Sequence, residues 1–102
     1  MTGSDTGFVA ECFWVGVADD DLRLLDERAA KSVSDMAGDG ARVRYLGSVL
    51  MRSDEVVLCF FEGSAASVRR AAVLAQIPFE RILETAGSPW AAVQEKRIAP
   101  GQ

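Results

Sequence analysis

The chain has 102 residues, of which 49% are hydrophobic and 25% charged, and it carries a net charge of −4. This length and composition predict one soluble globular domain with a single core. The acidic balance argues against nucleic acid and anionic membranes as partners, because both are bound by basic surfaces. No apolar stretch is long enough for a transmembrane helix and the N-terminus lacks a signal-peptide pattern, so we expect a cytoplasmic protein.

The first half of the chain predicts a strand and a helix. Residues 1–7 are mostly small and polar and are expected to form a disordered tail. The apolar and aromatic run 8–15 predicts a strand that Gly16 ends. One of the aspartates at 19–21 is expected to cap a helix that stops at 38–40. The apolar stripe of that helix consists of Leu22, Leu25, Ala29, Val33 and Met36.

The second half predicts a hairpin, a helix and a last strand. Segments 42–51 and 56–62 are expected to be antiparallel strands joined by the polar turn 52–55. Ser64 is expected to cap a helix that ends near residue 75, with Val68, Ala71, Ala72 and Ala75 facing inward. A fourth strand is predicted over 79–85, which closes a domain of residues 8–87. The C-terminal extension 88–102 contains either a fifth strand or a short helix over 90–98.

The order strand-helix-strand-strand-helix-strand predicts an α+β, ferredoxin-like fold with a four-stranded antiparallel sheet. Right-handed crossovers place the first and third strands in the middle and both helices on one face. In these two strands, both sets of alternate residues include large apolar side chains. The face of the sheet without helices is therefore also apolar and needs a partner. We therefore expect a homodimer, with two sheets face to face in a dimeric α+β barrel.

Four segments in this order resemble one protein family. The segments are Phe8-Val9-x-Glu11-x-Phe13 leading to Gly16-Val17, then Val43-Arg44-Tyr45-Leu46-Gly47-Ser48, then Cys59-Phe60-Phe61-Glu62, and Pro78-Phe79-Glu80-Arg81-Ile82. Together they resemble a family of small actinobacterial proteins named after a nickel-binding member and long catalogued as a domain of unknown function. The resemblance spans residues 8–86 and implies a ferredoxin-like fold, a dimer and nickel binding.

The chain departs from that family at three points. It has no histidine, whose imidazole is the ligand that suits nickel. Ala72 stands where family members often carry an asparagine. The chain also continues past the usual end of the family, and Trp90 in that extension is expected to cover an apolar edge or to contact a second copy. The resemblance therefore supports the fold, and we predict no metal site and no cofactor from these residues.

Glu11 is the first candidate for a functional residue, because it is a carboxylate in the middle of an apolar strand. Such a group must be paired, protonated or solvated in a cavity. It is either a catalytic general base or ligand anchor in the cavity of a dimer, or half of an ion pair with Arg44 or Arg42.

Arg44 and Ser48 are the next candidates, because strand periodicity places both on one face of the second strand. There they can hold an anionic or carbonyl group, with Phe13, Trp14 and Phe60 as apolar walls. The alternative is that Arg44 pairs with Glu11 or Glu62 and that Ser48 bonds the backbone. Gly47 marks a close approach or a β-bulge.

The remaining reactive side chains favour structural roles. Cys12 and Cys59 lie in predicted strands, and without a histidine neither can form a Cys-His pair, so both are expected to be buried, inert thiols. The aspartates at 19–21 suit helix capping better than a cation site.

The sequence leads to three functional hypotheses. The first is a protein that binds a small apolar or aromatic molecule in the cavity of a homodimer through Glu11, Phe13, Arg44, Ser48 and Phe60. Such a protein could also be a cofactor-independent enzyme of the isomerase or cyclase type, with Glu11 transferring the proton. The second hypothesis is nickel binding through carboxylates, and the third is a structural or regulatory dimer without a ligand.

Overall fold

The computed structural model describes residues 6–86 of the chain. Its elements are β1 (Thr6–Phe13), α1 (Asp19–Gly38), β2 (Val43–Met51), the 3-10 turn η1 (Arg52–Asp54), β3 (Val56–Gly63), α2 (Ala65–Leu74) and β4 (Arg81–Glu84). This order confirms the predicted α+β, ferredoxin-like fold. The predictions for residues 1–5 and for the extension 88–102, Trp90 included, lie outside the described residues.

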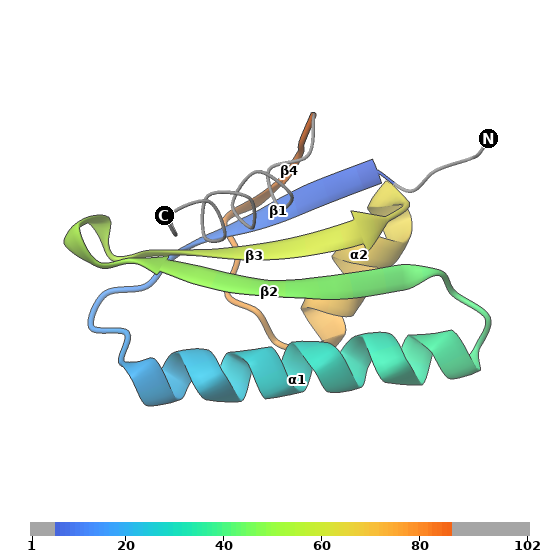
Figure 1. Cartoon of the computed structure of the whole chain (residues 1–102), viewed down its shortest axis with the longest axis horizontal. Coiled ribbons are helices and arrows are strands. Elements are labelled where there is room, and N and C mark those ends of the chain that lie inside the picture. Colours follow the sequence, from blue (N-terminus) through green and yellow to red (C-terminus); the bar gives the residue numbers. More distant parts are fainter. Residues whose placement is uncertain (1–5, 87–102) are drawn as a thin grey trace, which may run out of the picture.

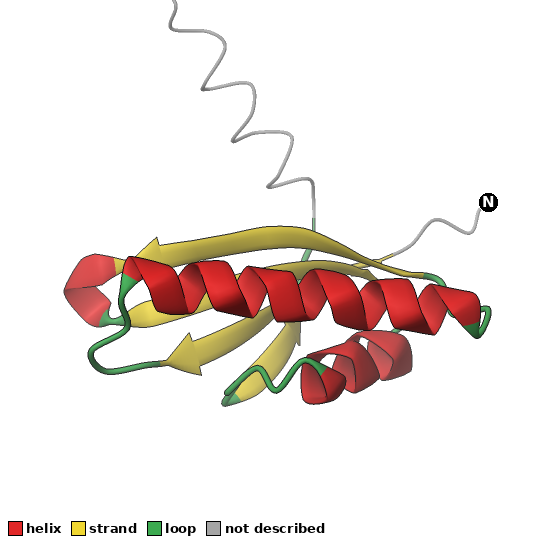
Figure 2. Cartoon of the chain, turned by 90° about the horizontal axis from the view of Figure 1, so that it is seen from below, coloured by secondary structure: helices red, strands yellow, loops and turns green. Residues whose placement is uncertain are grey.

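The four strands form one antiparallel sheet in the order β2-β3-β1-β4, so β1 and β3 are central as predicted. Both helices lie on one side of this sheet (Figures 1 and 2), and their apolar side chains share a core with every second residue of β1 and β3. Among residues 6–86, no helix is long and apolar enough to cross a membrane.

The first and fourth strands begin and end at other residues than predicted. β1 runs from Thr6 to Phe13, two residues earlier at each end than predicted, because Thr6 pairs with Gly63 at the far end of β3. β4 is four residues long, and the Glu80 N–H donates to the Glu11 carbonyl at 2.7 Å just before it begins. The fourth strand therefore pairs with only half of β1.

The helix starts follow from local hydrogen bonds. Ala18, rather than an aspartate, is the N-cap of α1, and the Asp21 carboxylate accepts from the Ala18 N–H at 2.9 Å. The acidic first turn therefore stabilises the helix start from inside the helix. Ser64 caps α2 as predicted, and its hydroxyl accepts from the Ser67 N–H at 3.1 Å.

The core fills the space between the helices and the sheet. Phe61, Leu25 and Met36 are its largest fully buried side chains. Small residues bring the two helices close together, and the buried Ser32 hydroxyl of α1 donates to the Ala71 carbonyl of α2 at 2.8 Å. Burial of one large apolar side chain contributes about 1.5–3 kcal/mol, so this layer supplies most of the stability of the domain.

A β-bulge interrupts the pairing of β2 with β3. Tyr45 lies opposite Phe61, whereas Gly47 lies opposite the next residue, Phe60, so Leu46 is an extra residue in β2. Gly47 has a φ of 120°, which favours glycine. After the bulge the alternation is reversed, so Tyr45 and Ser48 both face the helices.

Candidate functional site on the open face of the sheet

The side of the sheet turned away from the helices is called the open face. Its residues alternate along each strand with the buried ones and lie opposite one another across the strands. They are Val9, Glu11 and Phe13 of β1, Val56, Leu58, Phe60 and Glu62 of β3, Arg44, Gly47, Val49 and Met51 of β2, and Arg81 and Leu83 of β4.

The open face is apolar over most of its area, as the sequence predicted. Phe13 is 57% exposed, Met51 45%, and Val49 and Leu83 39% each. Neither helix covers this face, since both contribute their buried residues to the opposite side. Within residues 6–86, the open face is therefore an apolar surface in contact with solvent.

Glu11 lies inside this apolar surface and is held by Arg81. The Arg81 Nε donates to the Glu11 Oε1 at 2.6 Å, and the Glu11 side chain is 18% exposed. The expected partners Arg42 and Arg44 were wrong, because β2 lies beside β3 whereas β1 lies beside β4. Sequence reasoning missed Arg81, since its role depends on the β1–β4 register that places it opposite Glu11.

A second ion pair lies nearer the end of the open face. The Arg44 Nη1 donates to the Glu62 Oε1 at 2.9 Å, which is one of the two alternatives that the sequence left open for Arg44. The Glu62 side chain is 33% exposed. Each carboxylate on the open face is thus paired with an arginine of an outer strand.

Ser48 is not on the open face, so the prediction that it shares a face with Arg44 was wrong. The bulge turns Ser48 toward α1, where its hydroxyl donates to the Asp26 carboxylate at 2.6 Å. The Tyr45 hydroxyl donates to the same carboxylate oxygen. Burial, followed by this bond to Asp26, raises the pKa of the Tyr45 phenol above its usual range.

The structure therefore separates the five predicted site residues. Glu11, Phe13, Arg44 and Phe60 remain on the open face, and Ser48 joins a half-buried cluster with Asp26 and Tyr45 on the covered side. Asp26 had no signal in the sequence beyond its place on the polar side of a helical pattern.

The two cysteines lie on the covered side of β1 and β3, both without exposed surface. Cys12 is opposite Val57 and Cys59 is opposite Ala10, so the two are diagonal neighbours. The hydrogen bond with Cys12, followed by burial, raises the pKa of the Cys59 thiol. Both are buried free thiols, as predicted.

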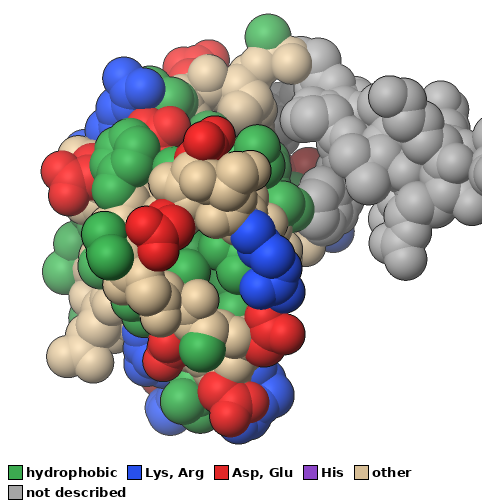
Figure 3. Space-filling model, turned by 90° about the vertical axis from the view of Figure 1, so that its left-hand side faces the viewer, with side chains coloured by type: hydrophobic (Ala, Val, Ile, Leu, Met, Phe, Trp, Pro, Cys, Tyr) green, Lys and Arg blue, Asp and Glu red, His purple; other side chains and the backbone are tan. Residues whose placement is uncertain are grey.

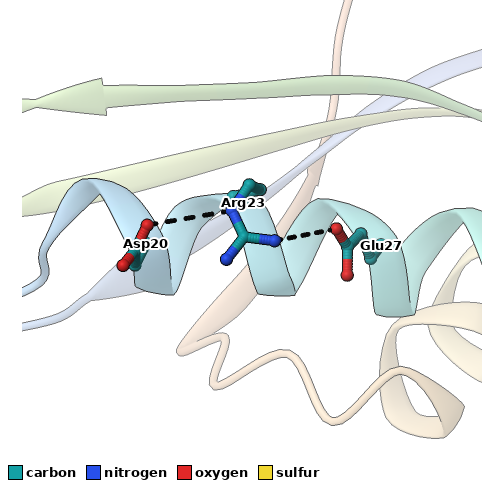
Figure 4. A network of polar contacts seen from close by, with 3 residues as sticks. All are labelled: Asp20, Arg23 and Glu27. Carbon is teal, nitrogen blue, oxygen red and sulfur yellow. Dashed lines mark hydrogen bonds and ion pairs between the residues drawn. The ribbon is translucent and has the colours of Figure 1, made fainter.

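The first two aspartates of α1 form ion pairs with nearby arginines. Arg23 lies between Asp20, at 3.7 Å, and Glu27, at 3.0 Å (Figure 4). Asp19 pairs with Arg52 of η1 at 2.7 Å. No group of three or more His, Cys, Asp or Glu side chains suited to a metal ion occurs within residues 6–86.

Figure 3 shows the end of the molecule that carries the start of α1 and η1. Hydrophobic side chains lie there among acidic and basic ones. A small open hollow between the α1 start and the β2–β3 turn is lined by Val17, Leu50, Arg52 and Glu55. The Glu55 Oε2 accepts from the Gly16 N–H at 2.9 Å, and Arg52 is paired with Asp19. Both polar groups of the hollow therefore hold the adjoining loop and helix in place.

The fold is similar to that of the protein SCO4226 from Streptomyces coelicolor A3(2), known from a crystal structure. The TM-score is 0.66 and the sequences are 20% identical, over 80% of this chain and 98% of that chain. No family model and no curated protein matches the chain. The likeness establishes a shared fold and carries no activity from one protein to the other.

Proposed function

We propose that this protein is a homodimer that binds a small apolar or aromatic molecule between the open faces of its two copies. The observation that carries the proposal is a sheltered carboxylate, Glu11, inside an exposed apolar sheet face. An apolar pocket with a few fixed polar groups is the usual composition of a small-molecule site.

A second copy fits the open face better than a charged partner does. The face carries two arginines and two glutamates, all four in ion pairs, so its own net charge is zero. Two such faces can meet without bringing unpaired charges together, although each chain carries a net charge of −4. A basic partner would instead seek an unpaired acidic surface.

We place the ligand over the middle of the face, where two residues have little side-chain volume. Packed sheets lie about 10 Å apart, and their side chains normally fill the space between them. Gly47 contributes no side chain at the point where it lies opposite Phe60, and Val9, opposite Phe60 on the other side, is small. A flat apolar molecule between two copies would lie against these residues.

Glu11 serves in this proposal as the polar anchor of the site. Proton transfer in an isomerase or cyclase would use the same carboxylate. Its ion pair with Arg81 supports the binding role, because the hydrogen bond fixes the position of the carboxylate.

Native mass spectrometry of freshly purified protein, followed by denaturation, tests the proposal. We expect a dimer that carries a stoichiometric organic adduct. A dimer carrying nickel would favour the function implied by the family resemblance, and a bare dimer would favour a structural role. A monomer would overturn the sheet-to-sheet arrangement.

Single-cysteine cross-linking tests which surface the two copies share. Cys12 and Cys59 are buried, so an added cysteine at Met51, at the end of the open face and away from the proposed ligand, would be the reactive one. We expect a short bismaleimide to link Met51→Cys into dimers, while Leu24→Cys, exposed on α1, stays unlinked. Equal cross-linking of the two variants would show that the open face is not the interface.

A further inference from the structure

We infer that the ligand of the open face carries an N–H or O–H donor on an apolar body, and that its donor binds the Glu11 carboxylate. This inference rests on the proposed function and adds the chemical class of the molecule. It follows from the difference between the two ion pairs of the open face.

The two ion pairs have different surroundings. Glu11 lies opposite Leu58, and the open-face residues before and after it along β1 are Val9 and Phe13. Apolar side chains therefore border it on three sides, with Arg81 on the fourth. Glu62 lies between Gly7 and Arg44, near the ends of the strands. The exposed fractions of the two side chains, 18% for Glu11 and 33% for Glu62, agree with this difference.

The Glu11 carboxylate has unused capacity to accept hydrogen bonds. A carboxylate offers about four acceptor sites on two oxygens. Its side chain accepts one hydrogen bond from the described part of the chain, from the Arg81 Nε to Oε1. When a second copy excludes water from the face, the other oxygen needs a donor, because a buried acceptor without one destabilises the assembly.

The charge balance around Glu11 selects against acidic ligands. Within residues 6–86, Arg81 is the cation paired with Glu11, and its charge is already matched by that carboxylate. An anionic head group would place a second negative charge beside Glu11 in a chain whose net charge is −4. An ammonium group gains a charge-assisted hydrogen bond instead, and a hydroxyl gains a weaker one.

The apolar residues around Glu11 favour an apolar body for the rest of the ligand. Val9 and Leu58 lie beside Glu11, and Phe60 lies opposite Val9. These three side chains offer apolar contact and an aromatic ring, and no donor or acceptor of their own. The structure thus points to a hydrophobic amine, or a phenol or alcohol of similar size.

Three size-matched probes test the inference by titration calorimetry: 2-phenylethylamine, 2-phenylethanol and 3-phenylpropanoate. We expect the amine to bind most tightly, the alcohol next and the acid least. Glu11→Gln should weaken amine binding about tenfold, as expected for the loss of one charge-assisted hydrogen bond. The matched control Glu62→Gln, which alters the other ion pair, should change amine binding by less than about twofold.

Tighter binding of the acid than of the amine would overturn the inference, as would equal losses in the two variants or a dimer that binds none of the probes. A monomeric protein would instead overturn the proposed function, so the two failures are distinguishable. If Glu11→Gln does not fold, as judged by circular dichroism, the ranking of the three probes on the unaltered protein decides the question.

Discussion

The two faces of the sheet are made from alternate residues of the same strands, yet only one of them is covered by the helices. On the covered face, Val57, Cys59 and Phe61 of β3 have no exposed surface. On the open face, Phe13 and Met51 are about half exposed, although they are as apolar as the core. The comparison teaches that residues 6–86 complete one core and leave the other apolar face of the sheet exposed.

The largest expected effect is on the covered face. Phe61 is fully buried, and its ring lies 5.1 Å from that of Tyr45. Phe61→Ala should lower the free energy of unfolding by about 3–5 kcal/mol, because it removes apolar contact and leaves a cavity. Chemical denaturation measures this change. A loss below about 1 kcal/mol would contradict the assignment of Phe61 to the core.

An open-face substitution should act on assembly rather than on folding. Phe13→Asp places a charge on the apolar surface proposed to meet a second copy, so the dimer dissociation constant should rise about 30-fold or more. Sedimentation velocity measures the constant. Leu24→Asp, an equally drastic change at an exposed site of α1, is the control and should leave it unchanged. A dimer unaffected by Phe13→Asp would place the interface elsewhere.

The Tyr45–Asp26 hydrogen bond should contribute a smaller amount to the covered side. Tyr45→Phe removes a donor to a half-buried carboxylate and should cost about 1.5 kcal/mol at neutral pH. The raised pKa of Tyr45 means that the folded protein keeps a proton that the unfolded chain loses above about pH 10. The contribution of protonated Tyr45 to the free energy of unfolding is therefore complete below about pH 10 and declines as the pH rises above it.

Denaturation of the unaltered protein and of Tyr45→Phe at pH 7 measures the contribution of the hydrogen bond, and the same comparison at pH 11 measures its pH dependence. The stability advantage of the unaltered protein over Tyr45→Phe should shrink at the higher pH. An advantage that is the same at both values would mean that Tyr45 does not titrate differently in the two states.

The smallest expected difference lies within the open face. Arg81→Gln should destabilise the protein by about 0.5–1 kcal/mol, because Glu11 is the more sheltered carboxylate. Arg44→Gln should cost less than about 0.5 kcal/mol, since Glu62 keeps more contact with water. Thermal unfolding of the two variants at one protein concentration compares them. The reverse order would show that Glu11 is not the more buried partner.

The sequence predicted most of the fold because its local signals agree with one another. The Ser64 cap, the inward residues of α2 and the order of elements were all readable from spacing. The site was less predictable, since its partners lie on different strands. Glu11 was found from its apolar neighbours, but Arg81 was not found, because the register of a four-residue edge strand leaves little pattern in the chain.

Ser48 is a second residue whose place in the site could not be predicted from the sequence. Strand periodicity places it with Arg44, and Gly47 predicts a close approach or a bulge, but the consequence for the following residues depends on which residue is extra. One inserted residue moves every later side chain to the other face. That choice is made by the pairing of β2 with β3, which places Tyr45 and Ser48 against Asp26 of α1.

By itself, the sequence determined the two helices, the four strands and the apolar character of both sheet faces, because these follow from the spacing of residues close together in the chain. The tertiary structure decided which carboxylate meets which arginine, which face of the sheet Ser48 occupies and that Asp26 has a role at all. These contacts join residues 18 to 70 positions apart in the chain, so they arise only when the sheet is assembled.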